Sequence, residues 1–389
     1  MSEPIVVGLP ASGLPVTGEP AADASAAPAV NADAEQVGEP AAVTSAAAAR
    51  GPLIMEAVAL NKVFQLGQGA SLQAVRNVSF GLYQGAVVAL VGESGSGKST
   101  VAKLLAGQER PTSGQVMLRG KPADVRRGRA FRRYKATVQY VFQDPFSSLN
   151  PVHTVGYQLS RPVKLHQAGV RDVRAAVTAL LEQVRLTPAG QYLAKYPHEL
   201  SGGQRQRVSF ARALAAQPAE LLADEPVSML DVSIRLEMLN LLDDLRARLS
   251  LALLYITHDI ASARYFADEV LVMYGGQLVE RGPAEEVTQR PAHPYTQLLI
   301  ASAPDPYNLG SALKGGSASQ SRASQSRASQ SRAGNVGPAP AGCPFSSRCP
   351  LADDKCRREN PALQPLSPAR AAACWRLDAA VPPPVASPR

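Results

Sequence analysis

Aromatic residues and cysteines are scarce in this sequence. Phenylalanine, tryptophan and tyrosine make up 5% of the 389 residues, and residues 1–50 contain none of them. This first stretch is rich in alanine, proline and valine and has no apolar period, so we expect a disordered tail. Its first basic residue is Arg50, so no charged segment precedes an apolar core and we expect no secretory signal.

Long apolar runs are also absent. No stretch reaches 18 uninterrupted apolar residues, so we expect no membrane-spanning helix, and other chains would have to supply any span. The four cysteines all lie beyond residue 342, which suits a reducing compartment better than a disulfide scaffold. The net charge is +8, but the basic residues are scattered and accompany no nucleic-acid-binding module. We therefore expect a solvated or membrane-adjacent face and no nucleic-acid partner.

A glycine-rich stretch at residues 92–100 gives the strongest positive signal. It matches the phosphate-binding pattern G-x-x-x-x-G-K-[ST] and lies between an apolar strand-like run and a helix-like run. Glycines let successive backbone N–H groups converge on an anion, and the helix N-terminus adds its positive dipole. Lys98 would reach the β- and γ-phosphates of a nucleoside triphosphate, and the Ser99 hydroxyl would bind Mg²⁺. The predicted ATP-binding residues are Phe64, Gly92, Glu93, Ser94, Gly95, Ser96, Gly97, Lys98, Ser99 and Thr100.

Apolar strands alternate with amphipathic helices along the chain, which predicts an α/β fold with a mainly parallel sheet covered on both faces. Antiparallel strands are expected between residues 54 and 80, and a helical insertion over about 144–215. Beyond Pro283 the sheet pattern is lost. Ligands gather at the carboxyl ends of parallel strands, and Gly92, Gln143, Asp224 and His258 all follow such ends.

Two adjacent acids end an apolar strand at residues 221–225. Asp224 is placed to hold Mg²⁺ through water, and Glu225 to polarise the water that attacks the γ-phosphate. Gln143 could touch both the metal and that water, and His258 could contact the γ-phosphate. Several of these residues also have an alternative interpretation. The two acids could belong to an ordinary helix N-terminus, and His258 could be a structural histidine. The Phe64 ring lies where it could stack on adenine, but it could instead belong to the core.

A second glycine motif carries a family resemblance. The run Leu200, Ser201, Gly202, Gly203 and Gln204 resembles the signature of ATP-binding-cassette (ABC) ATPases. The resemblance covers about residues 54–300 and implies a RecA-like P-loop NTPase fold whose signature faces the nucleotide of an opposite subunit. It also implies that Phe64 stacks on adenine, Gln143 forms the Q-loop, Asp224 and Glu225 are the Walker B acid and the base, Asp231 belongs to the D-loop, and His258 is the switch histidine.

The resemblance then narrows to the oligopeptide/dipeptide (and nickel) importer subfamily. It is carried by residues 143–151, 196–199, 231–234 and 293–296 and by the terminal segment from Gly342 to Cys374. Two departures are Met229, where alanine is usual, and Glu220, which interrupts an apolar strand and is expected to weaken its packing. We attach no function to the N-terminal tail or to the Ala-Ser-Gln-Ser-Arg repeats.

This likeness implies a subunit that hydrolyses ATP to power import of peptides or similar small solutes. Its partners would be a paralogous ATPase in a heterodimer, two membrane permeases and, indirectly, an extracytoplasmic solute-binding protein. It would be peripheral on the cytoplasmic face of the membrane. Alternatives are an importer of nickel or another solute, an inactive regulatory partner, and a soluble ABC ATPase in translation or DNA repair. That last class predicts two cassettes or a long coiled coil, and the sequence has neither.

The expected domains are a tail at 1–51, the ATPase at 52–300, a low-complexity linker at 301–337 and a small extension at 338–389. The extension contains Cys343, Cys349, Cys356 and Cys374 in a C-x5-C-x6-C-x17-C spacing. Four thiolates could hold a [4Fe–4S] cluster or zinc, or remain unliganded. A proline-rich segment lacking a core would gain its order from such a metal staple.

Overall fold

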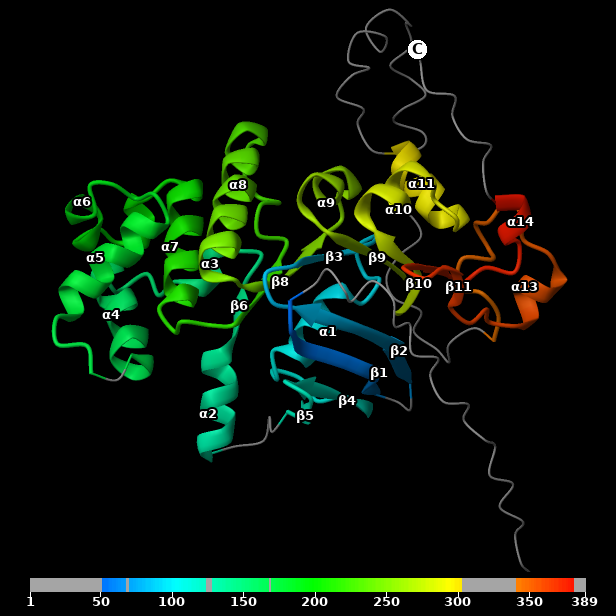
Figure 1. Cartoon of the computed structure of the whole chain (residues 1–389), viewed down its shortest axis with the longest axis horizontal. Helices are drawn as coiled ribbons and strands as arrows, with labels where there is room; N and C mark the ends of the chain where they lie inside the picture. The colour runs from blue at the N-terminus through cyan, green and yellow to red at the C-terminus, as the bar shows by residue number, and fades with distance from the viewer. Residues whose placement is uncertain (1–50, 68–69, 124–127, 168, 303–340, 381–389) are drawn as a thin grey trace, which may run out of the picture. The chain divides into compact units, whose positions relative to one another are not determined.

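The computed structural model describes residues 51–67, 70–123, 128–167, 169–302 and 341–380 (Figure 1). All of them belong to one compact unit, Val43–Arg389. Nearly all of the predicted tail and of the predicted linker lie outside the described residues.

An eight-stranded sheet runs through the molecule in the order β11-β12-β10-β9-β3-β8-β7-β6 (Figure 1). Its parallel pairs are β3 with β8 and β9, and β7 with β6 and β8, which confirms the predicted mainly parallel sheet. The parallel strands are β3 (Val87–Val91), β6 (Val138–Val141), β7 (Glu220–Asp224), β8 (Ala252–Thr257) and β9 (Glu269–Tyr274). Strand β10 (Gln277–Pro283) joins β9 antiparallel.

The sheet is buried on both faces, as the continuous apolar runs predict. Along β3, Val87, Ala89 and Val91 belong to one core cluster, and Val88 and Leu90 belong to the other. Successive side chains of a strand point to opposite faces, so both faces of β3 are covered. Full burial of one such aliphatic side chain contributes about 1.5–3 kcal/mol, so β3 holds the loop that follows it on a rigid base.

A separate four-stranded antiparallel sheet, with two strands before residues 92–97 and two after them, confirms the predicted antiparallel subdomain. Its order is β2-β1-β4-β5. The strands are β1 (Leu53–Gln65), β2 (Ser71–Tyr83), β4 (Ser113–Leu118) and β5 (Lys121–Pro122).

Helices account for most of the remaining described chain. Those around the parallel sheet are α1 (Lys98–Leu105), α2 (Gly128–Thr137), α8 (Val232–Leu249), α9 (Ile260–Phe266), α10 (Ala284–Gln289) and α11 (Pro294–Ser302). The predicted helical insertion contains α3 (Pro145–Ser148), α4 (Val155–His166), α5 (Val173–Gln183), α6 (Gly190–Leu193), a 3₁₀ turn (Pro197–Glu199) and α7 (Gly202–Leu214). Within the described ranges, no helix has both the length and the apolarity needed to cross a membrane.

The C-terminal extension joins the main sheet, which corrects the expectation that the sheet ends near Pro283. Strand β12 (Arg370–Ala372) pairs antiparallel with β10, and β11 (Gln364–Ser367) pairs with β12. Two short helices, α13 (Asp354–Arg358) and α14 (Leu377–Ala380), complete the extension. Phe345 is buried in the same cluster as the sheet residues, so the extension shares the main core and does not depend on a metal for all of its order.

Candidate nucleotide site

Residues 92–97 connect β3 to α1 and form a tight backbone turn. Gly97 has φ 103°, and a Cβ there would lie 2.3 Å from the carbonyl oxygen of Ala74. A Cβ on Gly92 would lie 2.2 Å from the carbonyl oxygen of Met273. Only glycine fits these two positions. The buried Ser96 hydroxyl inside the turn has no hydrogen-bond partner among the described residues.

Lys98 is folded back onto this turn. Its Nζ donates to the carbonyl oxygens of Gly92, at 2.7 Å, and Glu93, at 2.9 Å. Burial lowers the pKa of the Lys98 ammonium, while the nearby Glu225 and Asp224 carboxylates raise it. The ammonium thus lies beside the glycine turn with loop carbonyls as its present acceptors, which phosphate oxygens could replace.

Asp224 lies at the end of β7 and faces the first turn of α1. Its Oδ1 accepts a hydrogen bond from the Ser99 hydroxyl at 3.2 Å, and its Oδ2 accepts one from the Tyr140 hydroxyl at 2.6 Å. Burial and the Asp224 carboxylate raise the pKa of Tyr140, which keeps that phenol a donor. The sequence prediction missed Tyr140. The signal that could have found it is a tyrosine hydroxyl on β6, the strand that pairs with β7 and its terminal Asp224.

Glu225 brings the remaining predicted catalytic residues together. Gln143 Nε2 donates to Glu225 Oε2 at 2.9 Å, and His258 Nδ1 lies 3.3 Å from the same oxygen. Glu225 itself has φ 44°, in the left-handed region that non-glycine residues rarely adopt. The residues that follow β6 and β8 thus lie around the carboxylate of the residue that follows β7.

The signature residues begin α7 with reciprocal capping. Ser201 Oγ accepts a hydrogen bond from the Gln204 N–H at 3.3 Å, and Gln204 Oε1 accepts one from the Ser201 N–H at 3.0 Å. Ser201 and Gly202 are exposed, whereas Gly203 is buried and would place a Cβ 3.0 Å from Ile234 Cγ2. The exposed start of this helix can face a second subunit, and Gly203 allows α7 to pack on α8.

Two other predicted residues lie outside these contacts. Asp231 is exposed at the N-cap of α8, and its side chain makes no cap hydrogen bond to the helix. Phe64 is half-buried near the end of β1, with Lys62 Nζ 4.7 Å from its ring centroid. The adenine-stacking role of Phe64 stays a prediction.

All four cysteines of the extension are free thiols. Burial raises the pKa of Cys343 to about 11, with smaller contributions from Cys374, Cys356 and Cys349. The donors are of the type that an iron–sulfur cluster requires. As placed, however, the described part of the chain contains no group of three or more His, Cys, Asp or Glu side chains that could hold a metal ion.

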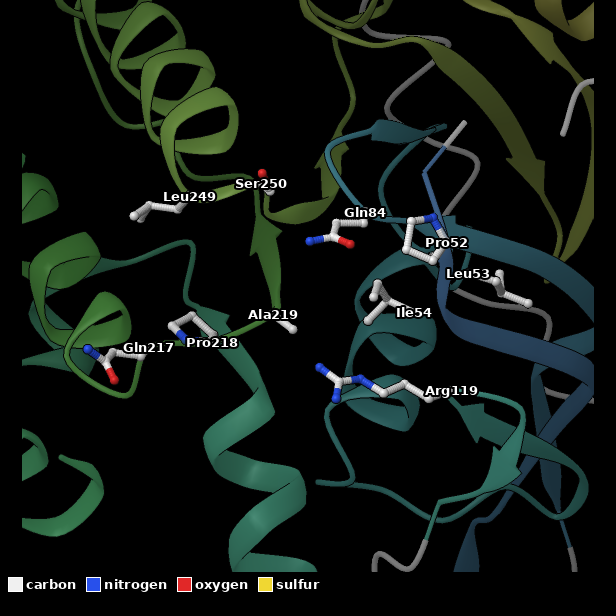
Figure 2. Close-up of a pocket in the computed structure, with 10 residues that line it drawn as sticks. All are labelled: Pro52, Leu53, Ile54, Gln84, Arg119, Gln217, Pro218, Ala219, Leu249 and Ser250. Atoms are coloured by element: carbon white, nitrogen blue, oxygen red, sulfur yellow. The ribbon is translucent and has the colours of Figure 1, made fainter. Parts of the chain in front are cut away.

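A cavity of about 550 Å³ lies at the amino-terminal ends of β7 and β8, whereas Asp224 and His258 lie at their carboxyl ends (Figure 2). It is lined by Ala219 and Ser250, which precede β7 and β8, and by Gln84 and Arg119. Asp224 ends β7, so in a parallel sheet this cavity and the acid occupy opposite strand ends. The cavity is therefore separate from the nucleotide site.

Comparisons with known proteins agree with this geometry. The profile of the family described as ABC transporter matches residues 75–228, and that described as Oligopeptide/dipeptide transporter, C-terminal region, matches residues 279–356. A putative peptide import ATP-binding protein of Brucella ovis is 40% identical over 310 residues, covering 79% of this chain and 93% of that protein. The di/tripeptide transport ATP-binding protein DppF of Pseudomonas aeruginosa is 38% identical over 335 residues, covering 84% and 98%.

Two solved structures share the fold. A subunit of the cbiONQ ABC transporter complex of Clostridium perfringens matches with TM-score 0.55 and 28% identity, over 61% of this chain and 90% of that one. A dimeric ATP-binding cassette bound to ADP and phosphate matches with TM-score 0.54 and 27% identity, over 59% and 99%. With relatives this similar along nearly their whole length, the chain belongs to the ATP-binding subunits of ABC transporters, in the branch that carries the oligopeptide/dipeptide transporter C-terminal region.

Proposed function

We propose that this chain hydrolyses ATP to power import of peptides or similar small solutes through a membrane permease complex. The observation that carries the proposal is the convergence of Gln143 and His258 on Glu225, with Asp224 at the end of the same strand, β7, and Lys98 after the turn that follows β3. The named activities of the relatives, peptide import and di/tripeptide transport, support the solute class. The chain would act as a peripheral protein on the cytoplasmic face of the membrane.

In this proposal the residues of one cassette divide the work of hydrolysis. The turn at 92–97 and Lys98 bind the phosphates of ATP, Glu225 polarises the attacking water, and Gln143 and His258 orient that carboxylate. Ser99 Oγ and Asp224 Oδ1, 3.2 Å apart, are hard oxygen donors of the kind that suits Mg²⁺. Mg²⁺ would neutralise charge on the phosphate oxygens when bound.

A second cassette would complete the site. The exposed Ser201 and Gly202 at the start of α7 provide N–H groups and a helix dipole for a nucleotide held by a partner. Asp231 is also exposed and follows the acid pair in sequence, where the resemblance to ABC ATPases places the D-loop that faces a partner. We propose that the partner is a paralogous ATPase, so that the functional unit is a heterodimer.

A groove of about 930 Å³ beside the helical insertion is the proposed docking place for the permease subunits. It is lined by residues of α3, α4 and α7 and of the segment between α3 and α4, including Asn150, Tyr157, Leu165 and Arg212. Tyr157 and Leu165 are exposed apolar side chains, and Arg161, Lys164 and Arg212 give the groove a basic lining. A solute-binding protein outside the cell would act on the permeases and not on this chain.

We also propose that the four cysteines of the extension hold a [4Fe–4S] cluster in the cell. Their number and chemistry support it, and the thiols would have to move into a ligand set. Anaerobically purified protein is expected to contain about four iron atoms per chain and to absorb visible light. Colourless protein without iron would reject the cluster. Stoichiometric zinc in that protein would show that the cysteines bind zinc instead.

Replacing Glu225 with glutamine tests the proposed hydrolysis. Glu225→Gln keeps the shape and the contacts of the side chain but cannot polarise water as a carboxylate does. We expect ATP binding to persist while phosphate release by the assembled transporter falls at least about 100-fold. Near-normal phosphate release would show that Glu225 is not the base.

A further inference from the structure

The C-terminal extension touches the nucleotide loop directly. Arg348 donates two hydrogen bonds to the Glu93 carboxylate, at 2.8 Å and 3.0 Å. Such a bidentate pair fixes both direction and distance, which a single contact does not. Glu93 is the second residue of the phosphate-binding turn, whereas Arg348 lies 255 residues later in the chain.

Aromatic rings hold Arg348 in this position. Its guanidinium lies 5.7 Å from the Phe345 ring centroid and 5.9 Å from that of Tyr274. Phe345 is fully buried and packs edge-on against Tyr274, with centroids 5.3 Å apart. The arginine is therefore anchored on the sheet by its neighbours and does not swing freely from an exposed loop.

A second contact reaches the same loop residue from α11. The Tyr295 hydroxyl accepts a hydrogen bond from the Glu93 backbone N–H at 2.8 Å. Tyr295 is fully buried, and its ring packs against Tyr274 and Phe345. Its own N–H donates to His293 Nδ1 at 3.0 Å, which requires that nitrogen to be unprotonated. Burial lowers the pKa of His293 to about 4 and so keeps the ring neutral at physiological pH.

Glu93 is thus held at three points. Its carbonyl accepts from Lys98, its N–H donates to Tyr295, and its carboxylate accepts from Arg348. Lys98 must leave the carbonyl to reach a phosphate, while the other two contacts can remain. The loop would then keep its shape through groups outside it.

We propose that Arg348 and Tyr295 are positioning residues for the phosphate-binding loop, so that the C-terminal extension, through Arg348, raises the affinity of this chain for ATP. The inference rests on the proposed role of the 92–97 turn and Lys98 in binding the nucleotide. It assigns the extension a role in the nucleotide site in addition to its place in the sheet.

The test compares nucleotide dissociation constants of full-length variants, measured with a fluorescent ATP analogue. Arg348→Ala is expected to weaken binding about three- to fivefold, the size expected from loss of a partly exposed ion pair. In the assembled transporter the KM for ATP should rise by a similar factor while kcat stays within about twofold, because the loop binds ground state and transition state alike. The matched control is Arg357→Ala, which removes an exposed ion pair with Asp354 in the same extension.

Variants on the loop side keep the test independent of folding of the extension. Glu93→Gln should weaken binding as Arg348→Ala does, and the two changes together should cost no more than either alone. The exchange Glu93→Arg with Arg348→Glu should recover part of the affinity that each single change loses. Full additivity in the double variant, or an Arg348→Ala affinity equal to that of Arg357→Ala, would overturn the proposal.

Lys98→Ala distinguishes failure of this proposal from failure of the proposed ATP-binding role of the 92–97 turn on which it rests. If Lys98→Ala abolishes binding and Arg348→Ala leaves it unchanged, only the positioning role fails. If Lys98→Ala binds nucleotide normally, the loop is not the ATP site and both proposals fail.

Discussion

At the scale of single residues, Glu220 shows how a buried acid ties stability to pH. Its carboxyl group at the start of β7 is fully buried, and neither oxygen has a hydrogen-bond partner among the described residues. Burial raises its pKa from 4.5 to about 8. Between these values the folded state binds a proton that the unfolded state has released, so the stability contribution is complete below pH 4.5 and is lost as pH rises towards 8.

Replacing Glu220 with glutamine should remove this pH dependence. Relative to the wild type, Glu220→Gln is expected to gain roughly 2–4 kcal/mol of unfolding free energy between about pH 5 and pH 8.5. Urea unfolding at both pH values measures the difference. Glu237→Gln is the control, because Glu237 lies exposed on α8, where it pairs with Arg207 of α7. A stability difference between Glu220→Gln and wild type that does not change with pH would contradict the raised pKa.

The sequence predicted the residues of the site unevenly, and the reason lies in how each one is positioned. Gln143, Glu225 and His258 follow apolar strands, so their meeting at one sheet edge follows from parallel topology. Tyr140 and Tyr295 are aromatic residues within apolar segments, where only the direction of a hydroxyl separates a core residue from one that contacts the site. That direction depends on tertiary packing, which no local pattern records.

At the scale of elements, the attachment of the extension depends on one buried ion pair. Glu280 on β10 is fully buried and accepts hydrogen bonds from the N–H groups of Ala292 and His293 and from Arg370 on β12, at 2.8 Å. Removing one partner of a buried pair leaves an uncompensated charge. Strand β12 is thus held by this carboxylate as well as by its ladder with β10.

Replacing Arg370 with methionine should therefore loosen the extension. We expect Arg370→Met to lower the unfolding free energy by about 3 kcal/mol and to speed proteolytic cleavage between residues 341 and 380. Arg376→Met is the matched control, because its ion pair with Asp353 is exposed to solvent and contributes little to stability. Equal stability of the two variants would mean that the buried pair does not hold the extension.

The same elements show why the extension was predicted to lie outside the sheet. Strands β11 and β12 have four and three residues, too few to establish an alternating pattern. Strand β7, in contrast, was recognised from the apolar residues Leu221, Leu222 and Ala223 directly before the acid pair. The extension is rich in proline and alanine and contains all four cysteines, which points to a loop-rich segment. Pairing with β10 overrides that local preference.

At the scale of the whole molecule, the groove beside the helical insertion should decide whether this chain joins a membrane complex. Leu165 is 69% exposed at the groove, where an apolar side chain gains nothing unless a partner covers it. Leu165→Glu places a charge at that contact without disturbing the core or the nucleotide loop. We expect the variant to bind ATP normally and to lose at least about tenfold in co-purification with the permease subunits, since the apolar contact is lost and the new carboxylate must give up its water when a partner covers it.

Leu366→Glu is the matched control for that experiment. Leu366 is 39% exposed on β11, the outermost strand at the end of the sheet opposite β6, whereas Leu165 belongs to α4 in the helical insertion that follows β6. The control should assemble as the wild type does, because its charge lies away from the groove. If Leu165→Glu also assembles normally, the permeases dock elsewhere, although ATP hydrolysis by the cassette would stand. If both variants fail, assembly depends on the surface charge of the whole chain and not on this groove.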